Sequence, residues 1–235
     1  MCSHYQGAKD LDRLKAEFGL GAFDSILDLD VWPLYQGYYV TRDQGQAPSE
    51  FAREGRIGQF GLLPHWAKDV KFGRQTYNAR SETAPAKPAF RDAWKRGQRC
   101  IVPAEAIFEP SWETGKAVPW RISHAEGRML GIAGLWSEWR DAGGTRHESF
   151  TMLTVNADGH QLMQRFHRPE DEKRMVVMLD PSEYDRWLDC PVDKMMSMMT
   201  RYPAELLVSE PAPVPPRKKK EQPEAVIEDD QQNLI

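Results

Sequence analysis

The residue with the most distinctive chemistry is Cys2, which follows Met1 at the start of the chain. A small second residue normally permits removal of the first methionine, so we expect Cys2 to become the mature N-terminus. An N-terminal cysteine carries both an amine and a thiol, with reference pKa values of roughly 7.7–8.0 and about 8.5. Near neutral pH an appreciable fraction of each group is then expected to be nucleophilic. The alternative is that Cys2 is a chance residue in a mobile terminus.

The remaining cysteines and the histidines suggest no metal or disulfide chemistry. The chain has three cysteines, an odd number without close pairs, which argues against a disulfide framework and a cysteine-rich zinc site. Cys100 and Cys190 are expected to be ordinary buried residues. The six histidines are scattered, no carboxylate or cysteine pair has metal-ligand spacing, and no phosphate-binding glycine motif occurs. We expect no metal and no cofactor.

A second chemical signal is a local excess of positive charge, from Arg53 to Arg99, which we call the basic segment. It holds 11 Lys or Arg and four Asp or Glu, a net +7, in a chain whose net charge is −4. Aromatic residues interleave with these charges, a mixture that suits base stacking beside phosphate contacts. The candidate contacts to single-stranded DNA are Trp66, Lys68 and Arg74. The alternative is a solvated surface that happens to be basic.

Hydrophobic spacing and turn residues predict short helices among several strands. Leu11, Leu14 and Phe18 share one helical face, so a helix is expected over 10–18, ended by Gly19. Asp180-Pro181-Ser182-Glu183 has the pattern of a helix start, with the helix running through Trp187. Further short helices are expected around 90–97 and 162–166. The expected strands are 35–41, 101–108, 118–122, 129–136, 149–155 and 175–179.

These elements predict an α+β fold, a single domain with a mainly antiparallel β-sheet or barrel-like core flanked by short helices. The domain is expected over 2–208. Residues 209–235 are rich in Pro and charge and poor in aromatics, so a disordered tail is expected there. No window approaches the ~18 apolar residues of a membrane span, and the N-terminus lacks a secretory pattern. We therefore expect a monomeric cytoplasmic protein that does not enter a membrane.

Several motifs, in a constant order, resemble those of the SRAP family, the SOS-response-associated peptidase-like proteins that attach covalently to abasic sites in single-stranded DNA. The resemblance covers roughly residues 2–179. Its motifs are Met1-Cys2, Pro64-x-Trp66-Ala67-Lys68-Asp69, Asn78-Ala79-Arg80-Ser81-Glu82-Thr83, Lys87-Pro88-Ala89-Phe90, Arg99-Cys100-Ile101-Val102-Pro103-Ala104 followed by Phe108-Glu109, and Ala133-Gly134-Leu135-Trp136.

The resemblance implies a role for individual residues. Cys2 corresponds to the catalytic cysteine, Asn78 to an active-site asparagine, and Arg80 to a phosphate contact. Glu109 matches the glutamate that closes its motif. The histidine that precedes an Arg-Met-hydrophobic strand is best matched by His167, although a six-residue stretch separates it from Arg174-Met175.

Two candidates compete with these assignments. His160 could replace His167, which we prefer because it lies closer to the Arg-Met strand. Glu105 lies four residues before Glu109, in the same expected strand.

The function expected from these residues is capture of an aldehyde. An abasic deoxyribose opens to an aldehyde, with which an aminothiol forms an imine and then a thiazolidine ring. Glu109 and His167 would move protons, and Asn78 would hold the nucleophile. We expect an abasic-site DNA-protein crosslinking enzyme, lyase- or peptidase-like, whose peptidase label implies removal of Met1. The alternatives are a cysteine-type peptidase or N-terminal-nucleophile amidohydrolase, and a noncatalytic single-strand-binding module.

The end of the tail suggests one further partner. Gln231, Leu234 and Ile235 resemble the Gln-x-x-Leu pattern of peptides that dock in bacterial sliding clamps. A flexible linker from Ser209 would raise the effective concentration of the protein at replication forks. The alternative is that the two apolar residues belong to a frayed chain end.

Overall fold

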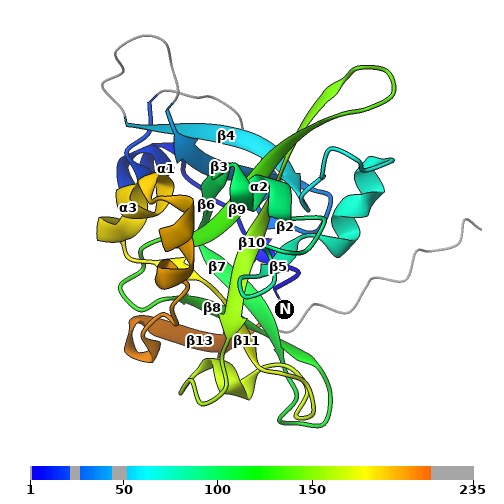
Figure 1. Cartoon of the computed structure of the whole chain (residues 1–235). Coiled ribbons are helices and arrows are strands. Elements are labelled where there is room, and N and C mark those ends of the chain that lie inside the picture. Colours follow the sequence, from blue (N-terminus) through cyan, green and yellow to red (C-terminus); the bar gives the residue numbers. More distant parts are fainter. Residues whose placement is uncertain (1, 22–26, 44–51, 213–235) are drawn as a thin grey trace, which may run out of the picture.

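Thirteen strands form the framework of the computed structural model, which describes residues 2–21, 27–43 and 52–212 (Figure 1). The strands are β1 (Tyr5–Gln6), β2 (Asp30–Val31), β3 (Gln36–Arg42), β4 (Arg53–Phe60), β5 (Asn78–Arg80), β6 (Arg99–Ala104), β7 (Ala106–Ser111), β8 (Val118–His124), β9 (Leu130–Arg140), β10 (Arg146–Asn156), β11 (Arg174–Val176), β12 (Met178–Leu179) and β13 (Leu207–Pro211). The residues expected to dock on a sliding clamp, Gln231, Leu234 and Ile235, lie outside the described part of the chain.

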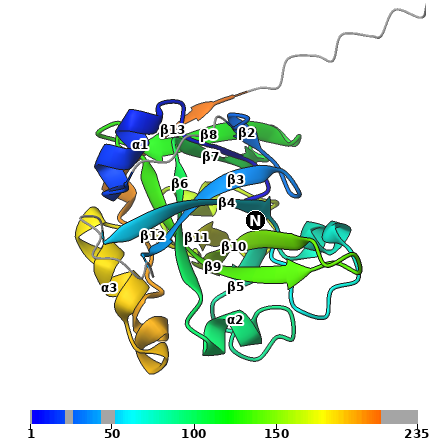
Figure 2. The same cartoon turned by 90° about the horizontal axis from the view of Figure 1, so that it is seen from above.

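The strands form two sheets. One has the order β13-β8-β7-β1-β2, and the other the order β11-β10-β4-β3-β6-β9-β12. Because β9 also pairs with β10, the strands β10, β4, β3, β6 and β9 close into a ring, a small barrel seen from above in Figure 2. Most pairings are antiparallel, but β10 runs parallel to both β4 and β5. The expected α+β fold with a mainly antiparallel, barrel-like core is confirmed.

Short helices flank the sheets. They are the α-helices α1 (Leu11–Phe18), α2 (Arg91–Lys95) and α3 (Tyr184–Asp189), and the 3₁₀ turns η1 (Val70–Gln75), η2 (Met163–Arg165), η3 (Pro181–Glu183), η4 (Val192–Met198) and η5 (Ala204–Leu206). The helices α1 and α3 lie on the same side of the barrel in both views (Figures 1 and 2). Stacking of Phe18 on Tyr184, with ring centroids 5.1 Å apart, joins them. Within the described residues, no helix has the length and apolarity needed to cross a membrane.

Local signals predicted the ends of α1 correctly. The side chain of Asp10 accepts hydrogen bonds from the backbone N–H groups of Asp12 and Arg13, at 2.9 and 3.1 Å. Gly19 ends the helix in the left-handed region, with φ 64°. Asp180 likewise accepts from the N–H of Ser182, so the expected helix start at 180–183 is confirmed, although its first turn is 3₁₀.

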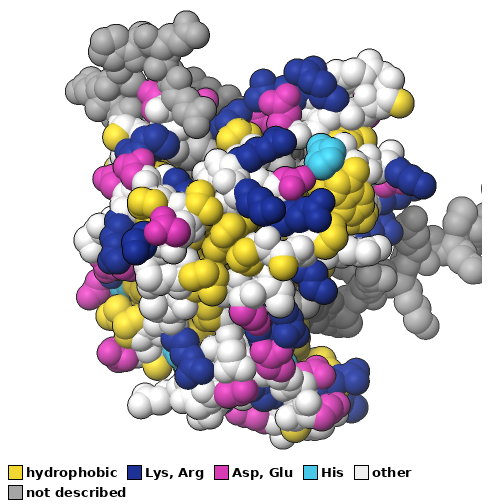
Figure 3. All heavy atoms as spheres, viewed as in Figure 1, with side chains coloured by type: hydrophobic (Ala, Val, Ile, Leu, Met, Phe, Trp, Pro, Cys, Tyr) yellow, Lys and Arg dark blue, Asp and Glu magenta, His cyan; other side chains and the backbone are white. Residues whose placement is uncertain are grey.

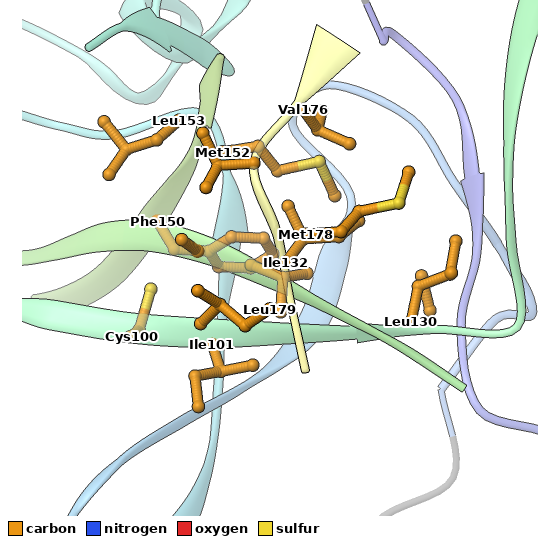
Figure 4. Packing of buried hydrophobic residues seen from close by; sticks show 14 of the residues in the cluster. Cys100, Ile101, Leu130, Ile132, Phe150, Met152, Leu153, Val176, Met178 and Leu179 are labelled. Atoms are coloured by element: carbon orange, nitrogen blue, oxygen red, sulfur yellow. The ribbon is translucent and has the colours of Figure 1, made fainter. Parts of the chain in front are cut away.

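The hydrophobic core is built by buried side chains on both faces of neighbouring strands. Figure 4 shows Cys100 and Ile101 from β6, Leu130 and Ile132 from β9, and Phe150, Met152 and Leu153 from β10, together with residues of β11 and β12. Phe150 is completely buried. Truncating such a residue to alanine typically costs about 3–5 kcal/mol of stability. The core therefore gives the strands that carry the polar residues a rigid support.

The expected strand over 101–108 is wrong, because the chain breaks at Glu105 into β6 and β7, which belong to different sheets. The N–H of Glu105 donates to the carbonyl of Gln6, and its carboxylate lies 3.0 Å from Nη1 of Arg13. These contacts fix the backbone at the strand break and keep the carboxylate of Glu105 in an ion pair with Arg13. The break also moves the following Glu109 into the sheet that contains β1.

Three other expected elements differ in extent. The strand over 175–179 is divided into β11, which pairs with β10, and β12, which pairs with β9. The helix over 162–166 is only the single turn η2. The tail was expected from residue 209, but Ser209–Pro211 continue β13 along β8, and the N–H of Ala212 donates to the carbonyl of Pro119. Backbone pairing at a sheet edge orders this polar segment without any need for a hydrophobic side chain.

Candidate functional site

Cys2 lies inside the protein, directly before β1, with 1% of its surface exposed. Its thiol donates to the carbonyl of His4, with 3.3 Å between Sγ and O. Burial, and then the negative charge of Glu109, raise the pKa of the thiol well above its ordinary value. The resting group is therefore the neutral thiol. The raised pKa differs from the expectation of an appreciable thiolate fraction, and the burial of Cys2 before β1 differs from the alternative of a residue in a mobile terminus.

Asn78 lies beside Cys2 at the start of β5. Its Nδ2 donates to the carbonyl oxygen of Cys2 at 2.6 Å, a contact between residues 76 positions apart. Parallel pairing of Asn78 with Met152 in β10 holds this strand in place. The Oδ1 atom of Asn78 is buried and has no hydrogen-bond partner within residues 2–21, 27–43 and 52–212. This acceptor is therefore available next to the backbone of Cys2.

Glu109 and His167 form a buried pair. The Nε2 atom of His167 lies 2.9 Å from Oε2 of Glu109, and their side chains are 8% and 1% exposed. The N–H of His167 donates to the carbonyl of Pro110 at 2.8 Å, and its φ of 65° is unusual for a residue with a side chain. Attachment of this loop to β7 places the imidazole against the carboxylate. The charge of Glu109 acts on the thiol of Cys2, so this carboxylate lies near that residue.

The four expected catalytic residues therefore come together from four separate segments of the chain. We call them the Cys2 cluster: Cys2, Asn78, Glu109 and His167. An amide, a carboxylate and an imidazole next to a thiol provide hydrogen-bonding and proton-transfer groups around one possible nucleophile. Among the residues that the structure describes, no group of three His, Cys, Asp or Glu is arranged to hold a metal ion.

The competing histidine, His160, has a different environment. Its Nε2 lies 2.7 Å from the carbonyl oxygen of Tyr202, and its Nδ1 accepts from the N–H groups of Leu162 and Met163 at 3.2 and 3.0 Å. Nδ1 thus holds the start of the turn η2, and Nε2 joins it to the segment that contains Tyr202. These contacts are typical of a structural residue, and of the two histidines it is His167 that pairs with Glu109.

The expected DNA contacts lie on the surface. Arg80, two residues after Asn78 on β5, is 46% exposed and lies 2.6 Å from Glu172 in an ion pair. Trp66 is 43% exposed and meets Phe72 edge to face at 5.0 Å between ring centroids. Lys68 and Arg74 are exposed. Figure 3 shows Lys and Arg side chains beside hydrophobic ones in the upper right of that face.

Two contacts hold the loop that carries Trp66 and Lys68. Nε1 of Trp139, on β9, donates to the carbonyl of Ala67 at 2.9 Å, and Leu63, Ala67 and Trp139 form a small second core. Gly61, with φ 122°, lies so close to Gly73 that a Cβ atom there would be 2.3 Å from the carbonyl oxygen of Gly73. This glycine pair lets the end of β4 lie against η1.

An aromatic stack beside Glu109 was not expected from the sequence. The ring of His4 lies between Trp32 and Phe108, with centroids 4.0 and 4.1 Å apart and planes within 7° and 9°. Burial lowers the pKa of His4, although Asp30, 2.8 Å away, acts in the opposite direction. A cavity of about 230 Å³ adjoins the stack, lined by Ser3, His4, Trp32, Phe108, Glu109, Pro110, Pro119 and Ala212. Trp32 has no sequence signal of its own, because the pairing of β1 with β2 brings it to His4.

The chain is similar to known proteins over most of its length. The family profile described as SOS response associated peptidase (SRAP) matches residues 1–214. The chain is 32% identical over 214 residues to "Abasic site processing protein YoqW" of Bacillus subtilis, covering 87% of this chain and 89% of that protein. It is 30% identical over 153 residues to "Abasic site processing protein HMCES" of Xenopus tropicalis, covering 56% of this chain and 44% of that one.

Solved structures share the fold. A crystal structure of a protein from Bordetella bronchiseptica is 41% identical in sequence and has a TM-score of 0.81, covering 91% of this chain and 100% of that chain. A crystal structure of a protein from Bacteroides thetaiotaomicron, 23% identical, has a TM-score of 0.76 and covers 89% of this chain and 91% of that chain.

Proposed function

The chain belongs to the SOS response associated peptidase (SRAP) family, and from that premise we propose that Cys2 forms a thiazolidine crosslink with the ring-opened abasic site of single-stranded DNA. The relatives named abasic site processing proteins support the handling of abasic DNA. The observation that carries the finer proposal is the Cys2 cluster, in which groups that can hold a nucleophile and move protons surround a cysteine at the second position.

The proposed reaction begins with hydrolysis of the Met1–Cys2 peptide bond, which consumes one water and frees the amine of Cys2. That amine attacks the aldehyde carbon of the open sugar, and the resulting carbinolamine loses water to form an imine. The sulfur then adds to the imine carbon while the thiol proton passes to the nitrogen. The ring holds the sugar carbon through one C–N and one C–S bond, and the capture step releases one water in total.

The raised pKa of Cys2 constrains the last step. Because the buried thiol is neutral, its proton must leave as the C–S bond forms. Glu109 and His167 form the pair that would accept and return this proton, and they would also protonate the leaving hydroxyl. Asn78 holds the carbonyl of Cys2 and leaves Oδ1 to accept from the new amine. The reaction as written uses no cofactor.

Binding of the strand is assigned to the surface beside the Cys2 cluster. Arg80 lies on the same strand as Asn78, and phosphate contacts supply most of the affinity for nucleic acid. The exposed Trp66 and Trp32 offer stacking faces for bases.

The alternative of a cysteine-type peptidase or amidohydrolase would need an activated thiolate. Burial and the nearby carboxylate disfavour that ionised form in Cys2. The test is a denaturing gel of purified protein with single-stranded DNA that contains one abasic site. We expect a covalent band, and no band when the sugar aldehyde has first been reduced with borohydride. Peptide cleavage without a band would support the peptidase, and reversible binding alone would support the binding module.

We also propose that the segment containing Gln231, Leu234 and Ile235 docks on a sliding clamp. The proposal depends on sequence pattern alone. A labelled peptide of residues 225–235 should bind purified clamp, and the same peptide with Leu234→Ala and Ile235→Ala should not. Equal binding of both peptides, or no binding of either, would contradict it.

A further inference from the structure

Glu172 forms a bridge between two arginines near the Cys2 cluster. Its Oε2 lies 2.6 Å from Nη1 of Arg80, and its Oε1 lies 2.6 Å from Nη1 of Arg174. Nδ2 of Asn156 also approaches Oε1, at 3.4 Å. The carboxylate is thus held by three donors from β5, β10 and β11. It belongs to the stretch of residues that separates His167 from Arg174 in the sequence.

The two arginines differ in how many partners they have besides Glu172. Arg174 is 2% exposed and forms a second, bidentate ion pair with Glu82, at 2.6 and 3.0 Å. It also donates to the side chain and the carbonyl of Thr154. Arg174 therefore keeps a balancing charge and several hydrogen-bond acceptors without Glu172, and it anchors the glutamate in place.

Arg80 has no such second partner. Its side chain is half exposed, and Glu172 is its one charged contact within the described residues. Since alternate residues of a strand face the same side, Arg80 projects from β5 on the side of Asn78. A DNA strand whose sugar reaches Cys2 would pass a phosphate near this guanidinium. In the DNA-free protein a carboxylate already occupies that partner position.

Glu172 is suited to imitate a phosphate. Burial opposes its ionisation, but hydrogen bonds from Arg174, Asn156 and Arg80 outweigh that effect and hold the pKa of the carboxyl below its usual value. It is therefore an anion at neutral pH. A guanidinium recognises carboxylate and phosphate oxygens with the same geometry. The two groups would therefore compete for the same N–H donors of Arg80.

We propose that Glu172 is a specificity-determining residue that occupies the phosphate position of Arg80 and must leave it before a DNA strand binds there. This inference rests on the proposed function. Competition by Glu172 lowers affinity for every single strand, damaged or not. Undamaged DNA then dissociates readily, whereas abasic DNA is retained because the covalent bond forms during the encounter. Glu172 thereby makes retention depend on the reactive sugar.

The test compares Glu172→Gln with Glu170→Gln in the full-length protein. Glu170 is exposed, lies on the same loop and forms no ion pair in the part of the chain described, so both variants remove one negative charge. Fluorescence anisotropy with a labelled, undamaged single strand should show Glu172→Gln binding about three- to tenfold more tightly than wild type. The Glu170→Gln control should bind nearly as wild type does.

A double variant tests whether the gain in DNA affinity depends on Arg80. In the background of Arg80→Ala, the gain from Glu172→Gln should disappear, because no guanidinium is left to release. Equal gains in DNA affinity for Glu172→Gln and Glu170→Gln would show that the effect comes from net charge alone, and would overturn the inference. Weaker binding by Glu172→Gln would also overturn it, since Glu172 would then position Arg80 for DNA.

The denaturing gel that detects the covalent band distinguishes failure of this inference from failure of the proposed function. If wild type forms no covalent band with abasic DNA, the proposed crosslink fails whatever the anisotropy shows. If wild type forms the band but Glu172→Gln binds undamaged DNA as wild type does, only the inference about Glu172 fails.

Discussion

The Cys2 cluster and the basic segment use polar residues in opposite ways. In the cluster each polar group is buried and has one or two defined contacts, such as the 2.9 Å contact of His167 with Glu109. In the basic segment Trp66, Lys68 and Arg74 are exposed to solvent. Burial makes a contact strong and leaves no substitute when it is lost. Exposed charges act additively and are screened by salt. A single substitution should therefore have a large effect in the cluster and a small one on the surface.

The largest expected effect is that of Cys2→Ser, which should abolish the stable crosslink. A hydroxyl is a weak replacement for sulfur in closing and holding the ring. The measurement is the covalent band on a denaturing gel with abasic single-stranded DNA. Cys190→Ser is the matched control, because Cys190 is buried in α3's C-terminal cap, and this variant should still crosslink. A Cys2→Ser protein that crosslinks as stably as wild type would disprove the mechanism.

Glu109→Gln should slow crosslink formation by about 10²–10⁴-fold, the usual contribution of a proton-transferring group. Affinity for undamaged single strands should stay within about twofold, since Glu109 is buried and is not a phosphate contact. Single-turnover gels give the rate and anisotropy gives the affinity. Equal losses in rate and affinity would show that Glu109 is structural.

Glu109→Gln should also change the reactivity of the Cys2 thiol toward an alkylating reagent, which it should raise rather than lower. The charge of Glu109 is one cause of the raised pKa of Cys2, so its removal should lower that pKa and increase the thiolate fraction at any pH below it. The pH dependence of iodoacetamide labelling at Cys2, followed by mass spectrometry, should shift to lower pH. At pH 8.5 we expect faster labelling than in wild type. Unchanged labelling would place Glu109 too far from the thiol to serve it.

Two of the buried histidines, His160 and His167, sharpen the comparison within the interior. His167→Asn should slow crosslinking by about 10²-fold, because the imidazole paired with Glu109 is lost. His160→Asn should leave the rate within about twofold but lower the midpoint of thermal unfolding, since His160 joins η2 to the carbonyl of Tyr202. Rates from gels and unfolding from circular dichroism separate the two effects. A loss of crosslinking rate in His160→Asn but not in His167→Asn would assign the proton-transferring role to His160.

The smallest expected effect is that of Arg80→Ala on the surface. Affinity for undamaged single-stranded DNA should fall by about two- to fivefold, and the salt dependence should decrease by up to about one unit of slope. The loss is modest because Glu172 already engages this guanidinium in the DNA-free protein. Anisotropy titrations at several salt concentrations measure both quantities. An unchanged affinity and slope would mean that the strand passes elsewhere.

Elements with local signals were predicted well. The cap residues Asp10 and Gly19 mark α1, and Asp180 marks the start of the helix that ends with α3, because each of these contacts is made within a few residues. The strand break at Glu105 was missed, although Glu105 is the one charged residue in an otherwise apolar run over 101–108. Its cause is a backbone bond to Gln6 and an ion pair with Arg13, both far away in the sequence.

The sequence by itself determined which chemical groups are present: the cysteine at position 2, the motifs around Asn78 and Glu109, and the excess of positive charge from Arg53 to Arg99. Only the tertiary structure decided what those groups contact. Folding brings Asn78 to Cys2, His167 to Glu109 and Glu172 to Arg80. These contacts join residues dozens of positions apart, and they depend on the register of whole strands over a buried core. For the same reason the thiol became neutral, because its environment comes from the folded chain rather than from its neighbours in sequence.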